Sequence, residues 1–314
     1  MKKTILLLSA IIIFISACSE PIPQEELTYI EANPEYVRTE IINSDGKYSV
    51  SDFICIDDKI IATDPENDCI LVTDKKTGEI KTAGQTGSGN EDYINPRGIW
   101  LHNDLIYIVD AGNARIKILD LQLNCRRNID LSSLTVAHPS DYLNDIAVDD
   151  NGNIYITVAA YYRESDGKLY FIRNGSDEIT AIMDRCTGVV TSCGGKAYFA
   201  NSLEYADNFG VSGNHFIYEL ENGKITSSYM LPYEYTPMGI YVDGGGIYCS
   251  SASFREISKV DLNNMQVTRL YFEPVKLSEG KSEYKEYGSL IPDGDAIYLI
   301  ESVSGAIYKL EKEK

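Results

Sequence analysis

The chain has 314 residues, of which 44% are hydrophobic, and its formal net charge is −19 at pH 7. This acidic balance excludes nucleic acid as the partner, because the chain has no basic stripe to neutralise phosphates. It also argues against the body of the protein lying on an anionic membrane. The length alone allows one large domain or two ordinary ones.

The N-terminus predicts an export signal. Residues 1–3 are basic and residues 4–15 form an apolar run, which is typical of a secretory signal and too short to span a membrane. The segment ISAC that ends at Cys18 resembles a bacterial lipobox, in which the cysteine becomes the lipid-modified first residue. We therefore predict a signal peptide at 1–17 and stable anchoring through several acyl chains. An ordinary signal peptide with a chance cysteine is the alternative.

The next segment, 18–33, is rich in Pro and Glu and predicts a flexible tether with a reach of roughly 50 Å. Ser19 stands where an Asp would resemble an inner-membrane retention signal, so the resemblance favours the outer membrane. The acidic residues Glu20, Glu25 and Glu26 resemble a surface-export signal. Whether the protein faces the periplasm or the surface stays open.

A strand motif recurs along the rest of the chain with a period of about 43–50 residues. An apolar run ending in turn residues precedes each copy, a third run follows it, and a fourth follows in most cases. The pattern predicts a six-bladed β-propeller with four antiparallel strands per blade. Two separate β-sandwiches would not keep one register throughout. The copies are KIIATD (59–64), LIYIVD (105–110), NIYITV (153–158), KAYFAN (196–201), GIYCSS (246–251) and AIYLIE (296–301).

The last repeat is short by one strand, because residues 287–311 supply only three. The segment EYVRTEII (35–42) is the candidate for the missing strand, and its pairing would latch the ring and remove an exposed sheet edge. We therefore predict one circular domain over 34–314.

Residues 87–121 resemble an NHL repeat, with a Gly-rich start, Pro-x-Gly-Ile, and a strand ending in Asp before Gly-Asn-x-Arg-Ile. The whole chain is similar to the NHL- or TolB-like six-bladed propeller lipoproteins of Gram-negative bacteria. Within this motif, Asp110 and Asn113 are expected to cap the turn between the second and third strands through bonds to the backbone. Direct contact with a ligand is the alternative.

Two long loops, 159–167 and 202–213, follow second strands of neighbouring blades and therefore share one face. Their aromatic and polar side chains suit sugar stacking or a protein hot spot. Packing against the blade edges is the other interpretation. The candidate binding residues are Tyr161, Tyr162, Arg163, Tyr205, Asp207, Asn208 and Phe209.

A second candidate group stands at the starts of the predicted innermost strands, around the mouth of the central channel. Converging side chains of mixed charge can hold a small polar ligand or a metal, although a solvated funnel would look the same. The residues are Asp52, Arg97, Asn144, Asp145 and Tyr287.

The sequence supports an enzyme less strongly than it supports a binding module. Six-bladed propellers that resemble lactonases hold a divalent metal with Glu, Asn and Asp, for which Glu301, Asn201 and Asp145 are available. By strand position, His102, His138 and His215 do not converge on one ion, and no catalytic residue, cofactor or disulfide pair is assigned. We predict a binding or scaffolding module for a protein or glycan partner. The alternative is a metal-dependent channel enzyme of the lactonase type.

Overall fold

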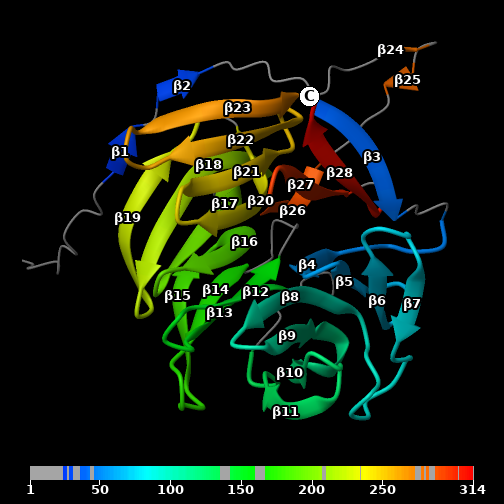
Figure 1. Cartoon of the computed structure of the whole chain (residues 1–314). Coiled ribbons are helices and arrows are strands. Elements are labelled where there is room, and N and C mark those ends of the chain that lie inside the picture. Colours follow the sequence, from blue (N-terminus) through cyan, green and yellow to red (C-terminus); the bar gives the residue numbers. More distant parts are fainter. Residues whose placement is uncertain are drawn as a thin grey trace, which may run out of the picture.

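The computed structural model is an all-β ring of six sheets around a central channel (Figure 1). Within each sheet, the strand that comes first in the blade lies at the channel, and consecutive first strands contact one another until the sixth meets the first. The predicted six-bladed propeller is confirmed. The structure describes residues 24–26, 28–30, 36–42, 46–134, 142–159, 167–206, 210–233, 235–272, 277–278, 281–282, 287–302 and 304–313.

The first three blades follow the predicted repeats. A 3₁₀ turn, η1 (Ala111–Asn113), joins the second and third strands of blade 2. The strands of blade 1 are β4 (Asp52–Ile56), β5 (Lys59–Asp64), β6 (Cys69–Asp74) and β7 (Ile80–Ala83). Those of blade 2 are β8 (Pro96–His102), β9 (Leu105–Asp110), β10 (Arg115–Asp120) and β11 (Cys125–Asp130). Those of blade 3 are β12 (Tyr142–Val148), β13 (Ile154–Ala159), β14 (Lys168–Ile172) and β15 (Ile179–Asp184).

The last three blades complete the circle, and a small hairpin of β24 (Leu277–Ser278) and β25 (Lys281–Ser282) lies between blades 5 and 6 in the chain. Blade 4 contains β16 (Cys186–Cys193), β17 (Lys196–Ala206), β18 (Gly210–Glu221) and β19 (Lys224–Met230). Blade 5 contains β20 (Pro237–Asp243), β21 (Gly246–Ser251), β22 (Glu256–Asp261) and β23 (Gln266–Phe272). Blade 6 contains β26 (Tyr287–Asp293), β27 (Ala296–Glu301), β28 (Ala306–Lys312) and β3 (Tyr36–Ile42).

Blade 6 is closed by the N-terminal strand, as the sequence predicts. β3 pairs antiparallel with β28 from Tyr36 opposite Lys312 to Ile42 opposite Ile307. Ile42 is fully buried in the cluster that joins blade 6 to blade 1. The latch therefore combines a ladder of backbone hydrogen bonds with apolar packing against both ends of the ring.

The second strand of each blade explains why its motif is apolar at almost every position. In β9, Ile106 and Ile108 belong to the core shared with blade 1, whereas Tyr107 and Val109 belong to the core shared with blade 3. Successive side chains of a strand point to opposite faces of the sheet. Because each sheet is sandwiched between two neighbours, both faces of its middle strands are buried and both sets of positions are apolar.

The segment expected to be a free tether is partly paired in the structure. β1 (Gln24–Glu26) runs parallel to β19, and β2 (Thr28–Ile30) runs parallel to β23 (Figure 1). The N-terminal segment thus adds a fifth strand to the outer edges of blades 4 and 5. The predicted signal peptide and Cys18 lie outside the described residues. In the part of the chain that is described, no helix is both long and apolar enough to cross a membrane.

Candidate functional site

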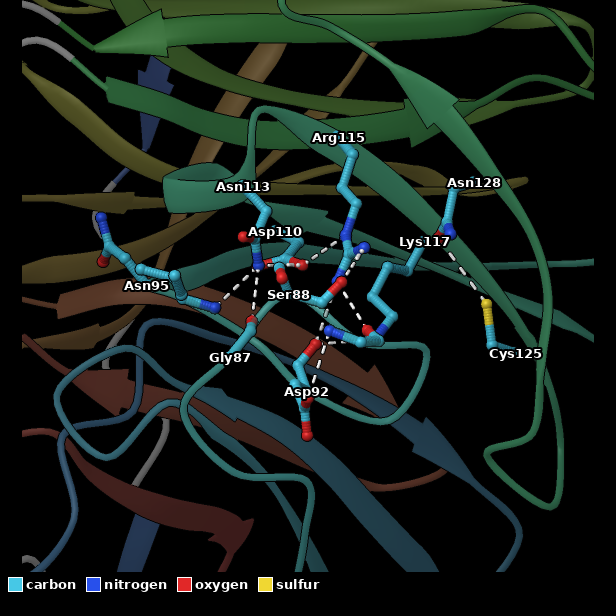
Figure 2. Close-up of polar contacts among 12 residues, drawn as sticks. Gly87, Ser88, Asp92, Asn95, Asp110, Asn113, Arg115, Lys117, Cys125 and Asn128 are labelled. Carbon is cyan, nitrogen blue, oxygen red and sulfur yellow. Dashed lines mark hydrogen bonds and ion pairs between the residues drawn. The ribbon is translucent and has the colours of Figure 1, made fainter.

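The turn between β9 and β10, residues 110–115, is held by a network of side-chain bonds centred on Asp110. The Asn113 amide donates to both carboxylate oxygens of Asp110, at 3.1 and 2.9 Å, and Arg115 Nε donates to Asp110 Oδ2 at 2.7 Å (Figure 2). The other side of the same carboxylate accepts the backbone N–H of Ile94 at 2.8 Å. Asp110 therefore joins the turn of its own blade to the inter-blade loop. The expected side-chain cap on the turn's own backbone is not made by Asp110, and the backbone groups that Asp110 and Asn113 bind are Ile94 N–H and Gly87 O of that loop.

The Gly-rich loop 84–95 is held by two basic side chains of β10. Arg115 donates to the carbonyl oxygens of Ser88 and Gly89, each at 2.9 Å (Figure 2). Lys117 is fully buried, donates to Asp92 O at 2.8 Å and lies 4.0 Å from the centroid of the Tyr93 ring. Desolvation lowers the pKa of Lys117. The loop carbonyls are thus already bound by the protein's own cations, which gives this loop a structural role.

The position of Asp110, the last residue of the recurring second-strand motif, is occupied in two other blades by residues named for a lactonase-like metal site. In blade 6 it is Glu301, whose carboxylate accepts the Ser304 hydroxyl, and in blade 4 it is Asn201. Both side chains are buried, and neither lines the channel cavity. Asp145, in contrast, lines that cavity. Within the described residues, no three His, Cys, Asp or Glu side chains are grouped to hold a metal.

The mouth of the channel forms a cavity of about 520 Å³. Its wall is built from all six blades and combines hydroxyl, amide, carboxylate and guanidinium groups with a tyrosine. The polar and aromatic lining residues are Ser49, Ser51, Asp52, Arg97, Tyr142, Asn144, Asp145, Thr187, Ser202, Thr236, Ser253, Ser289 and Ser302.

A ring of six equivalent positions narrows the channel below this cavity. In every blade, the fourth residue of the six-residue second-strand motif pairs with a residue of the first strand. The ring residue is the one immediately before that first-strand partner. A second cavity of about 170 Å³ lies on the other side, and four ring residues line both cavities. The ring is therefore a constriction between two hollows. Its members are Asp52, Gly98, Asp145, Val189, Gly239 and Ser289, of which Asp52, Asp145, Val189 and Ser289 line both.

Asp52 is the acidic ring residue of blade 1. Its carboxylate accepts the backbone N–H of Phe53 at 2.9 Å and that of Ile99, on the next blade, at 2.9 Å. The Ser289 hydroxyl is a further hydrogen-bond partner. Burial raises the pKa of Asp52 to about 6, because these hydrogen bonds offset only part of the desolvation.

Asp145 repeats this arrangement on blade 3. Its carboxylate accepts the N–H of Ile146 at 2.8 Å and that of Val190, on blade 4, at 2.8 Å. Desolvation raises its pKa well above the ordinary value, and the charge of Asp52 raises it further. The ring thus holds two interacting carboxyl groups, and the pKa of each is raised above its ordinary value.

Two glycines of the ring allow neighbouring blades to approach closely. A Cβ on Gly98 would lie 2.7 Å from Asp145 Cα, and one on Gly239 would lie 2.2 Å from Gly288 O. No side chain fits at either place without a shift of backbone. These two glycines therefore let the inner strands of neighbouring blades pack closely at the ring.

Four of the five mouth residues chosen from the sequence line the cavity together: Asp52, Arg97, Asn144 and Asp145. The Arg97 guanidinium lies 4.2 Å from the centroid of the Tyr142 ring, and its Nε donates to Asn95 Oδ1 at 2.9 Å. Tyr142 was not chosen from the sequence, although it begins an inner strand as the chosen residues do.

Tyr287 does not belong to this group. Its side chain is fully buried in a core cluster with Ile257 and Leu290, and its ring packs against that of Tyr271. The sequence interpretation placed it at the mouth because it starts an inner strand, but Tyr287 stands one residue earlier in the strand register than Arg97 and Asn144 do.

The loop residues chosen from the sequence fall largely outside the described part of the chain. Tyr205 lies in β17, which extends the predicted strand well beyond residue 201. Tyr161, Tyr162, Arg163, Asp207, Asn208 and Phe209 are not described.

The histidine and cysteine residues, which could act as metal ligands or nucleophiles, are dispersed through the fold. His102 ends β8, where its Nε2 lies 2.8 Å from the Asn103 amide, and His215 lies in β18 beside Phe216 and Tyr233. His138 lies outside the described residues. Among the described residues, no disulfide joins Cys55, Cys69, Cys125, Cys186, Cys193 or Cys249.

Several solved structures share the fold at low sequence identity. A luciferin-regenerating enzyme matches with a TM-score of 0.60 and 14% identity over 89% of this chain and 95% of that one. An auxiliary nutrient binding protein from Bacteroides thetaiotaomicron matches with a TM-score of 0.58 and 12% identity over 90% of this chain and 78% of that one. A catalytically inactive virginiamycin B lyase from Staphylococcus aureus with quinupristin matches with a TM-score of 0.57 and 14% identity, over 89% and 100%.

At these identities the likeness establishes the fold alone. A search of curated proteins finds no match. A family described as "6-bladed beta-propeller" (DUF5128) matches residues 48–289, which is more than half of the chain. This protein therefore belongs to that six-bladed β-propeller family.

Proposed function

We propose that this protein is a lipid-anchored propeller of the bacterial cell envelope that binds a glycan at the mouth of its channel. The observation that supports this proposal most strongly is the cavity of about 520 Å³, which is lined by residues of all six blades. Its volume falls in the usual range of small-ligand sites. A scaffold for a protein partner is the other form of binding that the sequence allows, and the proposed experiment separates the two.

The chemistry of the wall supports a polyhydroxylated ligand. Ser49, Ser51 and Ser302 bring hydroxyl groups to the cavity, and Asn144 and Arg97 bring an amide and a guanidinium. Such groups exchange hydrogen bonds with sugar hydroxyls in both directions. The Arg97–Tyr142 stack gives the wall a flat cationic surface.

The proposed cellular location follows from Cys18 and the signal peptide that precedes it. Lipidation there would hold the propeller at a membrane, and the residue after Cys18 favours the outer membrane. The structural similarity to a protein named for nutrient binding concerns the fold, and a binding role for that fold agrees with this proposal.

The test is a glycan array and an envelope-protein pull-down with residues 19–314, the mature chain without its lipid-bearing Cys18. Arg97→Ala and Asn144→Ala remove groups from the mouth, while Arg126→Ala on the exposed outer strand of blade 2 is the matched control. We expect specific glycans to bind the wild type and the control, with about tenfold or greater loss in the mouth variants. Binding that is equal in all four proteins contradicts a mouth site. Capture of a protein without any glycan binding contradicts the glycan proposal.

A further inference from the structure

The second cavity, on the other side of the ring from the mouth, differs from the first in its chemistry. Its volume is about 170 Å³. Apart from the ring residues, its wall is mainly apolar, with Phe53, Trp100 and Tyr241 as aromatic members and Leu101 and Ile291 among the aliphatic ones. An apolar cavity of about 150 Å³ can hold a benzene molecule. The second cavity is therefore large enough for one compact apolar group.

Two carboxyl groups stand where this cavity meets the ring. Asp52 and Asp145 line both cavities, and an ionised carboxylate offers about four acceptor positions. Asp145 uses two of them for the backbone N–H groups of Ile146 and Val190. Asp52 uses two for backbone N–H groups and one for the Ser289 hydroxyl. Acceptor positions are therefore left for a ligand at this end of the cavity.

In the described part of the chain, one basic side chain lines the two cavities, and other groups hold it. That side chain is Arg97, at the mouth. Its guanidinium stacks on the Tyr142 ring, and its Nε donates to Asn95 Oδ1. The charge of Asp52 meanwhile raises the pKa of Asp145. A cation placed between the two carboxylates would offset this repulsion.

We propose that the second cavity binds a small primary amine, with its apolar body against Trp100 and its ammonium group at Asp52 and Asp145. The three N–H donors of an ammonium group match the acceptor positions left on the two carboxylates, and its charge is opposite to theirs. The wall removes the apolar body from water, which favours binding. The site is separate from the proposed glycan site, because Trp100 lines the second cavity and does not line the first.

Binding of the amine should depend on pH through the two carboxyl groups. The pKa of Asp52 is raised to about 6, and that of Asp145 is raised as well. The affinity therefore falls as pH is lowered through about 6, because a protonated carboxyl group no longer attracts the ammonium. Burial raises the pKa of Cys55 to about 11 and also raises that of Tyr241, so these groups of the cavity stay neutral over this range. Arg97 stays charged throughout.

The experiment titrates residues 19–314, which contain every described residue, with benzylamine and follows the fluorescence of Trp100. The chain has a single tryptophan, so the signal reports on the second cavity. Benzyl alcohol is the neutral probe of the same shape. Asp145→Asn removes a charge from the site, Asp177→Asn in an exposed turn is its matched control, and Leu101→Phe fills the cavity. Circular dichroism confirms that each variant folds, and Ile291→Phe replaces Leu101→Phe if that variant does not.

We expect a saturable change with benzylamine near pH 8, and binding weaker by about tenfold or more for benzyl alcohol, for Asp145→Asn and for Leu101→Phe. Asp177→Asn should bind as the wild type does. No saturable change, or equal binding of benzyl alcohol, contradicts the amine site. Undiminished binding in Leu101→Phe contradicts its place in the second cavity, and an affinity that is the same at pH 5 contradicts the role of the carboxyl groups. No glycan enters this experiment, so either proposal can fail without the other.

Discussion

Asp52 and Asp145 occupy equivalent ring positions on blades 1 and 3, and each accepts a backbone N–H from the inner strand of the following blade. The ring thereby uses carboxylates both to join blades and to line the channel. The charge of Asp52 raises the pKa of Asp145, so the two groups titrate as a coupled pair.

Replacing Asp52 with Asn should lower the pKa of Asp145, because the neutral amide removes the repulsion that favours a protonated partner. The measurement is an NMR pH titration of the Asp145 side-chain carboxyl carbon in the wild type and in Asp52→Asn. Asp177→Asn, in an exposed turn of blade 3, is the control and should leave the titration of Asp145 in place. An unchanged Asp145 pKa in Asp52→Asn would show that the two carboxyls do not interact.

Stability should also depend on pH through this pair. The folded-state pKa of Asp52 is raised to about 6 and that of Asp145 is raised as well, so the folded state binds more protons than the unfolded state in weak acid. The contribution of Asp52 is therefore most favourable below its unfolded pKa, near 4, and is lost as pH rises through about 6. The contribution of Asp145 changes with pH in the same direction.

The check compares urea unfolding of the wild type with that of the Asp52→Asn, Asp145→Asn double variant between pH 4 and pH 7. The free energy of unfolding of the wild type should fall relative to the double variant as pH rises. A difference that is constant, or that rises with pH, would contradict the raised pKa values.

Gly98→Ala should destabilise the fold by about 2 kcal/mol or more, because the added Cβ meets the backbone of Asp145. Gly239→Ala should behave alike, since its Cβ meets Gly288 O. Gly244→Ala is the control, as a Cβ there meets nothing within 4 Å. Urea unfolding gives the three values, and equal stability of Gly98→Ala and Gly244→Ala would mean that the blades do not approach as described.

The closure of blade 6 by β3 can be tested by mutation. Ile42→Ala should cost about 2–5 kcal/mol, because Ile42 is fully buried between blades 6 and 1. Val37→Ala on the same strand should change stability by less than about 0.5 kcal/mol, because Val37 is half exposed. Thermal or urea unfolding decides this, and a small loss for Ile42→Ala would argue that β3 does not close the ring.

The fold was predictable from the sequence because the middle strands of a propeller are buried on both faces. Apolar runs such as LIYIVD therefore recur at a fixed period. The last repeat supplies only three strands, so it needs a fourth from elsewhere in the chain, and β3 is that strand. The pairing of β1 and β2 was not predictable. Strand addition of this kind depends on backbone groups of distant outer strands, and the acidic sequence near Gln24 carries no strand pattern of its own.

The site was predictable only in part, because position within a strand decides where a side chain points. Arg97 and Asn144 stand one residue before the ring and line the mouth, whereas Tyr287 stands two residues before the ring residue Ser289 and turns into the core. Glu301 and Asn201 are, like Asp110, the last residues of their second-strand motifs, and neither of them lines the channel cavity. One residue of shift is enough to move a side chain to the other face of a strand.

The central claim, a ligand site at the channel mouth, is tested most directly by isothermal titration calorimetry with the strongest glycan from the array. The account predicts one site per chain and binding about tenfold or more weaker in Arg97→Ala than in the wild type and Arg126→Ala. Equal affinity in all three proteins, or no heat of binding in any of them, would contradict it.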